Sequence, residues 1–179
     1  ENAANIIINV FWGPSYNTIY SVSLKLPNMM RKIFMDPTWT LTPTFTDLAA
    51  KGDRRKMEFL FFTFSKMIAI ITHPLILTLM LLSQLIIASW VGPQFEMAGT
   101  ILPIYALPLF FGMPVALTGC LFNAYGKVKL PSFVTFGMAV VNLILCFVLG
   151  YFLSLKLYGI AFAGVISAMV PSCLFYPFY

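Results

Sequence analysis

The stretch EFLFFTFSKMIAIITHPLILTLMLL, residues 58–82, decides the fold class of this chain. Only Glu58 and Lys66 carry charge in it, and it is long enough for the roughly 20 mostly apolar residues that a bilayer-spanning helix needs. Further apolar stretches of the same character follow at residues 97–122, 131–155 and 159–179. The sequence therefore predicts an all-α, polytopic membrane protein.

The composition supports the same fold class. Of the 179 residues, 60% are hydrophobic and 9% are charged, whereas ordinary globular domains have roughly 45–50% and about 25%. Apolar residues extend along nearly the whole chain, which argues against a soluble domain with a single anchor. The net charge of +5 is explained by basic loops that face an anionic lipid leaflet, so no nucleic-acid partner is expected.

The first part of the chain is more polar than the rest. Residues 2–12 are apolar but stop at Gly13 and Pro14, as a truncated span would, and both ends of the chain look cut. Residues 15–45 have an amphipathic helical pattern that is broken by prolines at Pro27, Pro37 and Pro43. Such a segment either lies on the membrane surface or lines a polar cavity, where its charges avoid lipid. In total we expect about six transmembrane helices, of which the first is truncated.

Basic residues in the loops predict the orientation, because Lys and Arg are retained on the cytoplasmic side. They cluster in two predicted loops that are two crossings apart: Lys51, Arg54, Arg55 and Lys56, then Lys127 and Lys129. The opposite side carries only Lys156. We therefore expect a multi-pass protein of the cytoplasmic (inner) membrane, with residues 47–57 and 126–130 cytoplasmic and residues 13–16, 83–96 and 155–158 external.

The residues that could support catalysis are few. His73 precedes Pro74, where it either bonds backbone carbonyls freed by the proline kink or relays protons. The cysteines lie in apolar stretches without metal-ligand spacing, so they are interpreted as packing residues: Cys120, Cys146 and Cys173. The carboxylates are scattered. We therefore predict a protein that is not an enzyme and has no metal site and no cofactor.

Charges at membrane depth indicate function better, because each costs a few kcal/mol unless it faces a cavity or a partner. Polar residues at three- and four-residue steps share one helical face: Lys25, Asn28, Lys32, Asp36 and Trp39. Arg31 lies within the same segment. Lys66 would add to this cationic stripe from a neighbouring helix, unless it snorkels to the interface. Such groups attract phosphate or pyrophosphate in a water-filled cleft.

Uncharged features bear on helix packing. Asn5 and Asn9 share a helical face with Asn2 and either join helices or line a cavity. Prolines at five- and six-residue steps predict kinks within residues 97–122: Pro103, Pro108 and Pro114. Gly112 and Gly119 allow close helix packing in the same stretch.

A series of landmarks in sequence order covers essentially the whole chain: NIIINVFWGPSYNTIYSVSLKL (5–26), LTPTFTDLAAKGDRRKMEFL (41–60), SKMIAIITHPLILTLMLL (65–82), IIASWVGPQFEMAGTILPIYAL (86–107), NAYGKVKLPSF (123–133), NLIL (142–145) and YGIAFAGVIS (158–167). Together they resemble the polysaccharide (O-antigen or lipid-linked oligosaccharide) flippases of the multidrug/oligosaccharidyl-lipid/polysaccharide exporter superfamily. The resemblance implies a two-lobed protein of twelve to fourteen helices, of which this chain holds most of the second, C-terminal lobe.

The resemblance also implies a function. Such proteins carry polyprenyl-pyrophosphate-linked oligosaccharides across the cytoplasmic membrane by alternating access, with a cationic cavity around the head group. The candidate head-group contacts here are Lys25, Arg31, Lys32 and Lys66. Where relatives often carry an acid near the position of Asn5, this chain has an amide, which leaves Asp36 as the candidate for coupling to H+ or Na+. The implied partners are the lipid-linked oligosaccharide, membrane lipids, a polysaccharide polymerase and glycosyltransferases.

Other functions remain open on the sequence. A multidrug and toxin extrusion antiporter of the same superfamily would favour acidic and aromatic lining for cationic drugs. A membrane-embedded glycosyltransferase or acyltransferase would need a catalytic acid or His and a substrate loop longer than the loops predicted here. A purely structural subunit would leave the membrane-depth cations unexplained.

Overall fold

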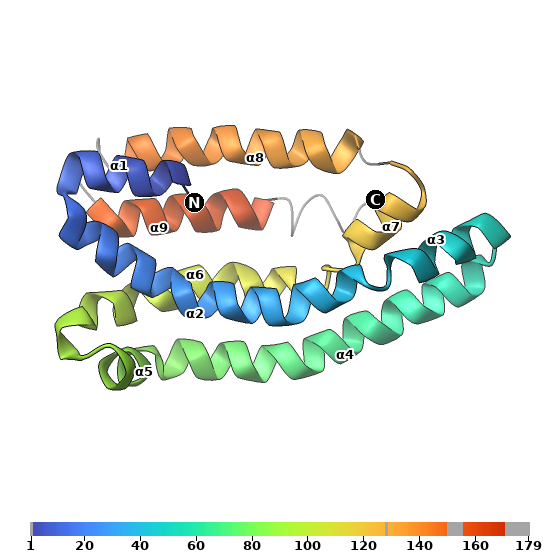
Figure 1. Cartoon of the computed structure of the whole chain (residues 1–179), viewed down its shortest axis with the longest axis horizontal. Helices are drawn as coiled ribbons and strands as arrows, with labels where there is room; N and C mark the ends of the chain where they lie inside the picture. Colours follow the sequence, from blue (N-terminus) through green and yellow to red (C-terminus); the bar gives the residue numbers. More distant parts are fainter. Residues whose placement is uncertain (1, 128, 150–155, 171–179) are drawn as a thin grey trace.

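The computed structural model describes residues 2–127, 129–149 and 156–170. The regular structure in these ranges is helical throughout (Figure 1). The helices are α1 (Asn2–Trp12), α2 (Pro14–Trp39), α3 (Thr42–Lys51), α4 (Arg54–Leu81), α5 (Ser83–Trp90), the short 3-10 helix η1 (Pro93–Phe95), α6 (Glu96–Gly112), α7 (Thr118–Ala124), α8 (Lys129–Phe147) and α9 (Lys156–Val170). The chain is therefore an all-α protein, as its hydropathy predicts.

Helix α6 lies at the centre of the arrangement and packs against α2, α4, α5 and α9. Figure 1 shows α2 crossing in front of α6, with α4 along one side of the molecule and α8 along the other. Helix α8 packs on α9, α1 packs on α2, and α3 packs on α7 and α4. Buried side chains of α6 contribute to two of the core clusters, with Ile101 in one and Leu102 and Ala106 in the other.

The apolar helices identify the molecule as a membrane protein. Arg54–Leu81 and the segment Pro93–Gly112 are long and apolar enough to cross a membrane, and Pro131–Phe147 and Leu157–Met169 are shorter apolar helices. Large apolar side chains on the outer faces are exposed, such as Phe59 at 70% and Phe133 at 76%. Their exposure is favourable only where hydrocarbon replaces water.

Helix α2 differs from its expected form because it continues through both Pro27 and Pro37. The chain turns instead at Thr40 and Leu41, before α3 begins at Thr42. Pro27 is buried in the contact surface of α2. Tertiary packing of the apolar side of a helix can offset the local cost of a proline, so the polar residues of α2 keep a common helical register.

The stretch 97–122 does not form one helix. Helix α6 contains Pro103 and Pro108, but it ends at Gly112, and Pro114 lies in the turn before α7. A proline lacks the backbone N–H and clashes with the preceding turn, a cost that α6 accommodates at Pro103 and Pro108, whereas the chain breaks before Pro114. The segment 83–96 contains its own helix, α5, which a turn at Gly92 (φ 110°) separates from η1. The expected spans 131–155 and 159–179 extend beyond the described residues, as does Cys173.

Candidate functional site

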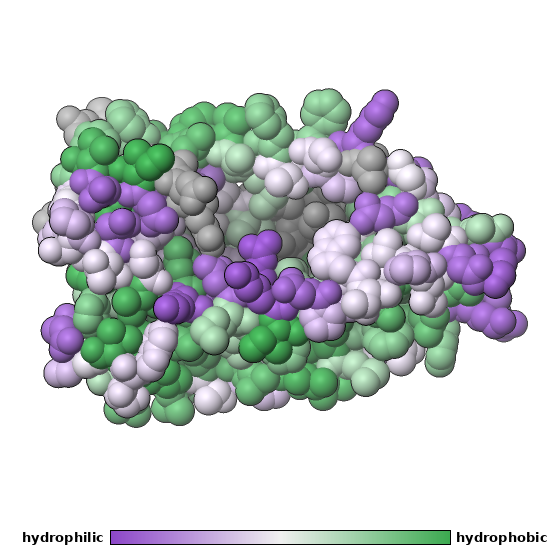
Figure 2. Space-filling view, viewed as in Figure 1, coloured by the Kyte–Doolittle hydropathy of each residue, from purple (hydrophilic) through white to green (hydrophobic). Residues whose placement is uncertain are grey.

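The candidate site is the exposed polar face of α2. Lys25, Lys32 and Asp36 are all exposed, and at about 100° per residue they lie within about 20° of the direction of Lys25 around the helix. The opposite side packs on the core through residues such as Ser23, Pro27 and Met30. Figure 2 shows hydrophilic side chains gathered along α2 on the face in view. The structure therefore brings Lys25, Lys32 and Asp36 together on one accessible face.

The charges on this face are not neutralised by their neighbours. The ion pairs within the described ranges are Lys51–Asp47 (Nζ–Oδ2 2.6 Å) and Lys56–Asp53 (3.3 Å), both outside α2. Lys32 and Asp36 are one turn apart, but no salt bridge joins them. Arg31 is exposed as well, although it points about 120° away from Lys25 around the helix. The stripe is therefore centred on Lys25 and Lys32, and Arg31 lies to one side of it.

Lys25 has an aromatic partner that the sequence did not indicate. Its ammonium nitrogen lies 6.0 Å from the ring centroid of Trp90, at the end of α5. A cation over an aromatic face at this distance is stabilised by about 0.5–1 kcal/mol at an exposed site. Residues 25 and 90 are far apart in the chain and carry no shared motif, so only the tertiary packing of α5 reveals the contact.

Lys66 is not brought to this stripe. It lies in α4, where Ile68 packs into the same core cluster as Met30 and Phe34 of α2. Lys66 is about 160° from Ile68 around the helix, and its exposed neighbours Phe59 and Ile70 are apolar. Its side chain therefore points away from the core that α4 shares with α2.

The asparagines of the first helices have different environments. Asn9 is exposed. The side-chain oxygen of Asn5 is buried and has no hydrogen-bond partner, and the same is true of Asn17 on α2. Because α1 packs on α2, these acceptors lie on two adjoining helices. Elsewhere the amide of Asn142 is satisfied, since it donates to Ser167 Oγ at 2.9 Å.

His73 makes a local contact within its own helix. Its Nδ1 lies 2.7 Å from the carbonyl oxygen of Ala69, and its ring meets Phe110 edge to face at 4.1 Å between centroids. A carbonyl oxygen only accepts, so Nδ1 is the donor. The carbonyl that Pro74 leaves without its helical partner is that of Ile70, one residue further along. His73 therefore supports the backbone beside the proline, and no carboxylate faces it in these contacts.

No group of three or more His, Cys, Asp or Glu residues in the described ranges is placed to hold a metal ion. The cysteines in the described ranges, Cys120 and Cys146, are buried free thiols and offer the site equally little chemistry. What the site offers is positive charge on a helix face, which binds anions by attraction and by donated hydrogen bonds.

Comparisons with known proteins relate the chain to a family and to a membrane protein. Residues 1–100 match the family described as "Polysaccharide biosynthesis protein". The "Uncharacterized membrane protein EpsK" of Bacillus subtilis (strain 168) is 28% identical over 174 residues. The match covers 96% of this chain and 34% of that relative, so the chain spans about a third of its length. No solved structure matches the chain.

Proposed function

We propose that this chain, which belongs to the polysaccharide biosynthesis protein family, forms part of a transporter that flips a polyprenyl-pyrophosphate-linked oligosaccharide across the cytoplasmic membrane. The observation that carries the proposal is the exposed, uncompensated pair Lys25 and Lys32 on one face of α2. Two ammonium groups suit a pyrophosphate, which presents several anionic oxygens to donors.

We propose that α2 crosses the membrane, which would place Lys25 at a depth that suits a transport role. Lys25 lies eleven residues after the start of α2 at Pro14, which is about 16 Å along the helix at 1.5 Å per residue. A hydrocarbon core is about 30 Å thick, so a head group bound at Lys25 would sit well inside the membrane. We propose that the stripe holds the head group there while the surrounding helices alternate between openings to the two sides.

The coupling to an ion gradient is a further part of the proposal. Asp36 is the carboxylate on the same face of α2, and no ion pair in the described ranges neutralises it. The buried oxygen of Asn5, with no donor of its own, is the other candidate. The carboxylate of Asp36 could bind H+ or Na+, whereas the amide oxygen of Asn5 could coordinate Na+ but would not take up a proton.

The competing functions fit the stripe less well. In a multidrug antiporter, Lys25 and Lys32 would repel the cationic compounds to be carried, although Asp36 and Trp39 of α2 would attract them. A glycosyltransferase would need a catalytic carboxylate or His beside a substrate loop, whereas His73 is occupied with Ala69 and Phe110. Polysaccharide export therefore remains the function that the site supports best.

The test is export of the cell-surface polysaccharide by the intact protein in its native host. Lys25→Ala and Lys32→Ala should each reduce the export rate by about 10- to 100-fold, because a hydrogen bond to a charged group contributes about 1.5–3 kcal/mol. Lys25→Arg should restore much of the rate. Lys127→Ala removes an exposed cation from a turn and serves as the matched control, and Lys66→Ala should also retain export.

The amount of each variant in the membrane is measured alongside, so that failed folding is not read as failed transport. Export that is unaffected in the Lys25→Ala/Lys32→Ala double variant, at normal protein levels, would refute the proposed site. A loss of drug resistance with intact polysaccharide export would favour the antiporter.

A further inference from the structure

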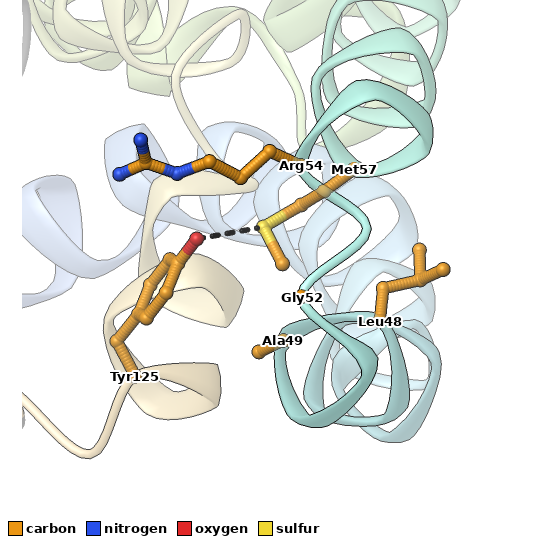
Figure 3. A pocket seen from close by; sticks show the side chains of 6 residues that line it. All are labelled: Leu48, Ala49, Gly52, Arg54, Met57 and Tyr125. Atoms are coloured by element: carbon orange, nitrogen blue, oxygen red, sulfur yellow. Dashed lines mark hydrogen bonds between the residues drawn. The ribbon is translucent and has the colours of Figure 1, made fainter.

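A second positively charged site lies at the end of the molecule where α3 meets α4. It is a pocket of about 150 Å³ whose lining comes from α3, the following turn, α4 and the end of α7: Leu48, Ala49, Gly52, Arg54, Met57 and Tyr125. Figure 3 shows Met57 and Arg54 on the α4 side and Tyr125 facing them from α7. The transport stripe on α2 contributes no residue to this pocket.

The local backbone explains why Arg54 reaches the pocket. Gly52 ends α3 in the left-handed conformation (φ 69°), where its N–H bonds the carbonyl of Ala49. Asp53 then caps α4 by accepting a hydrogen bond from the backbone N–H of Lys56. The reversal at Gly52 places Arg54, the first residue of α4, beside Leu48 and Ala49 at the end of α3.

The polar groups of the pocket are available to a ligand. Tyr125 donates its hydroxyl to the sulfur of Met57 at 3.4 Å, and a thioether is a weak acceptor. Asp47 and Asp53 already pair with Lys51 and Lys56. Glu58 lies one turn beyond Arg54 on α4, but no ion pair joins them. The guanidinium of Arg54 therefore has no carboxylate partner in the described ranges.

The surroundings favour an anion over a neutral ligand. Lys127 is exposed and lies two residues after Tyr125, and it forms no ion pair in the part of the chain described. A planar guanidinium binds phosphate oxygens through paired N–H groups, and the phenol supplies one more donor. Arg54 and Tyr125 thus place two kinds of donor on the lining of one pocket.

The position of the pocket selects the source of that phosphate. It lies at the start of α4, which is long and apolar enough to cross a membrane, so the pocket is level with the lipid head groups at that end of the helix. Its remaining walls are the apolar side chains of Leu48, Ala49 and Met57. We propose that this pocket binds the phosphate of an anionic phospholipid, with Arg54 and Tyr125 as donors. The proposal is independent of transport.

The test measures lipid binding to the intact protein in nanodiscs. Phosphatidylcholine discs with and without added phosphatidylglycerol are compared by native mass spectrometry, which counts retained lipids. Arg54→Ala should weaken retention of phosphatidylglycerol by about tenfold, and Tyr125→Phe by a smaller factor, because a charge-assisted bond is roughly twice as strong as a neutral one. Arg55→Ala is the matched control, because it removes the same charge from a residue outside the pocket lining.

The outcomes separate the alternatives. Selective loss in Arg54→Ala, with Arg55→Ala unchanged, supports the site. Equal loss in both variants would mean diffuse attraction between basic residues and the bilayer, and it would overturn the proposal. A parallel titration with inorganic phosphate at constant ionic strength tests the other source: binding of free phosphate to Arg54 without any preference for phosphatidylglycerol would also overturn it.

Discussion

The contact between α5 and α6 depends on Gly99, and replacing this glycine gives the sharpest test of the packing. A Cβ at Gly99 would lie 2.9 Å from the Cα of Gln84 in α5, closer than side-chain atoms approach backbone. Gly99→Ala therefore forces α5 away from α6, at a cost of about 1–3 kcal/mol for an overpacked contact. Because Trp90 is at the other end of α5, the displacement should also weaken its contact with Lys25.

The matched control is Gly137→Ala in α8, where a Cβ would meet nothing within 4 Å. Both changes add an alanine to a helix, so both gain the same propensity of roughly 1 kcal/mol. The difference between the two variants isolates the clash, and we expect Gly99→Ala to have the lower apparent melting temperature by about 2–4 °C per kcal/mol. Equal melting temperatures in detergent would show that α5 does not rest on Gly99 and would refute the packing.

Two further predictions concern the ends of the helices. Asp53→Ala should lower the melting temperature because it removes the cap of α4, whereas Asp53→Asn should keep most of the stability. The hydrogen bond from the Lys56 backbone N–H lowers the pKa of Asp53. The stability that this cap gives the folded protein is therefore present above the ordinary carboxyl pKa and is lost as the pH falls through the lowered value. If the melting temperature of Asp53→Ala depended on pH as strongly as that of the unchanged protein, this explanation would be contradicted. In the intact protein, a thiol introduced at the exposed position Ala50 should be labelled from the cytoplasmic side, and one at Gln94 from the external side. The buried Cys120 and Cys146 should stay unlabelled. Labelling of Ala50→Cys from outside would show that the predicted orientation is wrong.

The sequence predicts where the helices are better than where they end. The expected span 58–82 corresponds to α4, which begins four residues earlier, at Arg54. The signal for the earlier start was present in Gly52 and Asp53, which are typical of a helix end followed by a helix cap. The break at Pro114 was harder to place, because Pro103 and Pro108 precede it in the same stretch and stay helical. Only the surrounding contacts decide which proline ends a helix.

The direction of a side chain around its helix is the part that the sequence could not predict for α4. In a soluble helix the apolar face marks the core, but a membrane helix is apolar both where it packs and where it meets lipid. The expectation for Lys66 depended on which face of α4 touches its neighbours, and Ile68 and Phe59 are equally apolar in the sequence. In α2 the same question was answerable, because one of its faces is polar and the other is not.

Because Lys66 points away from the core that α4 shares with α2, the residues that remain together as a candidate site are those on the polar face of α2. A single lysine such as Lys66 costs about 3 kcal/mol at the centre of a helix in a bilayer, and snorkelling reduces this cost. Lys25, Lys32 and Asp36 share one face, so lipid against that face would cost about 3 kcal/mol for a charge at the centre of the bilayer and less for a charge nearer an interface. The opposite face of α2 is committed to the core through Pro27 and Met30, so the helix cannot rotate to hide its charges. If α2 spans the membrane, as we propose, its polar face must therefore meet water or another protein surface, which is the condition that a head-group site inside the membrane requires.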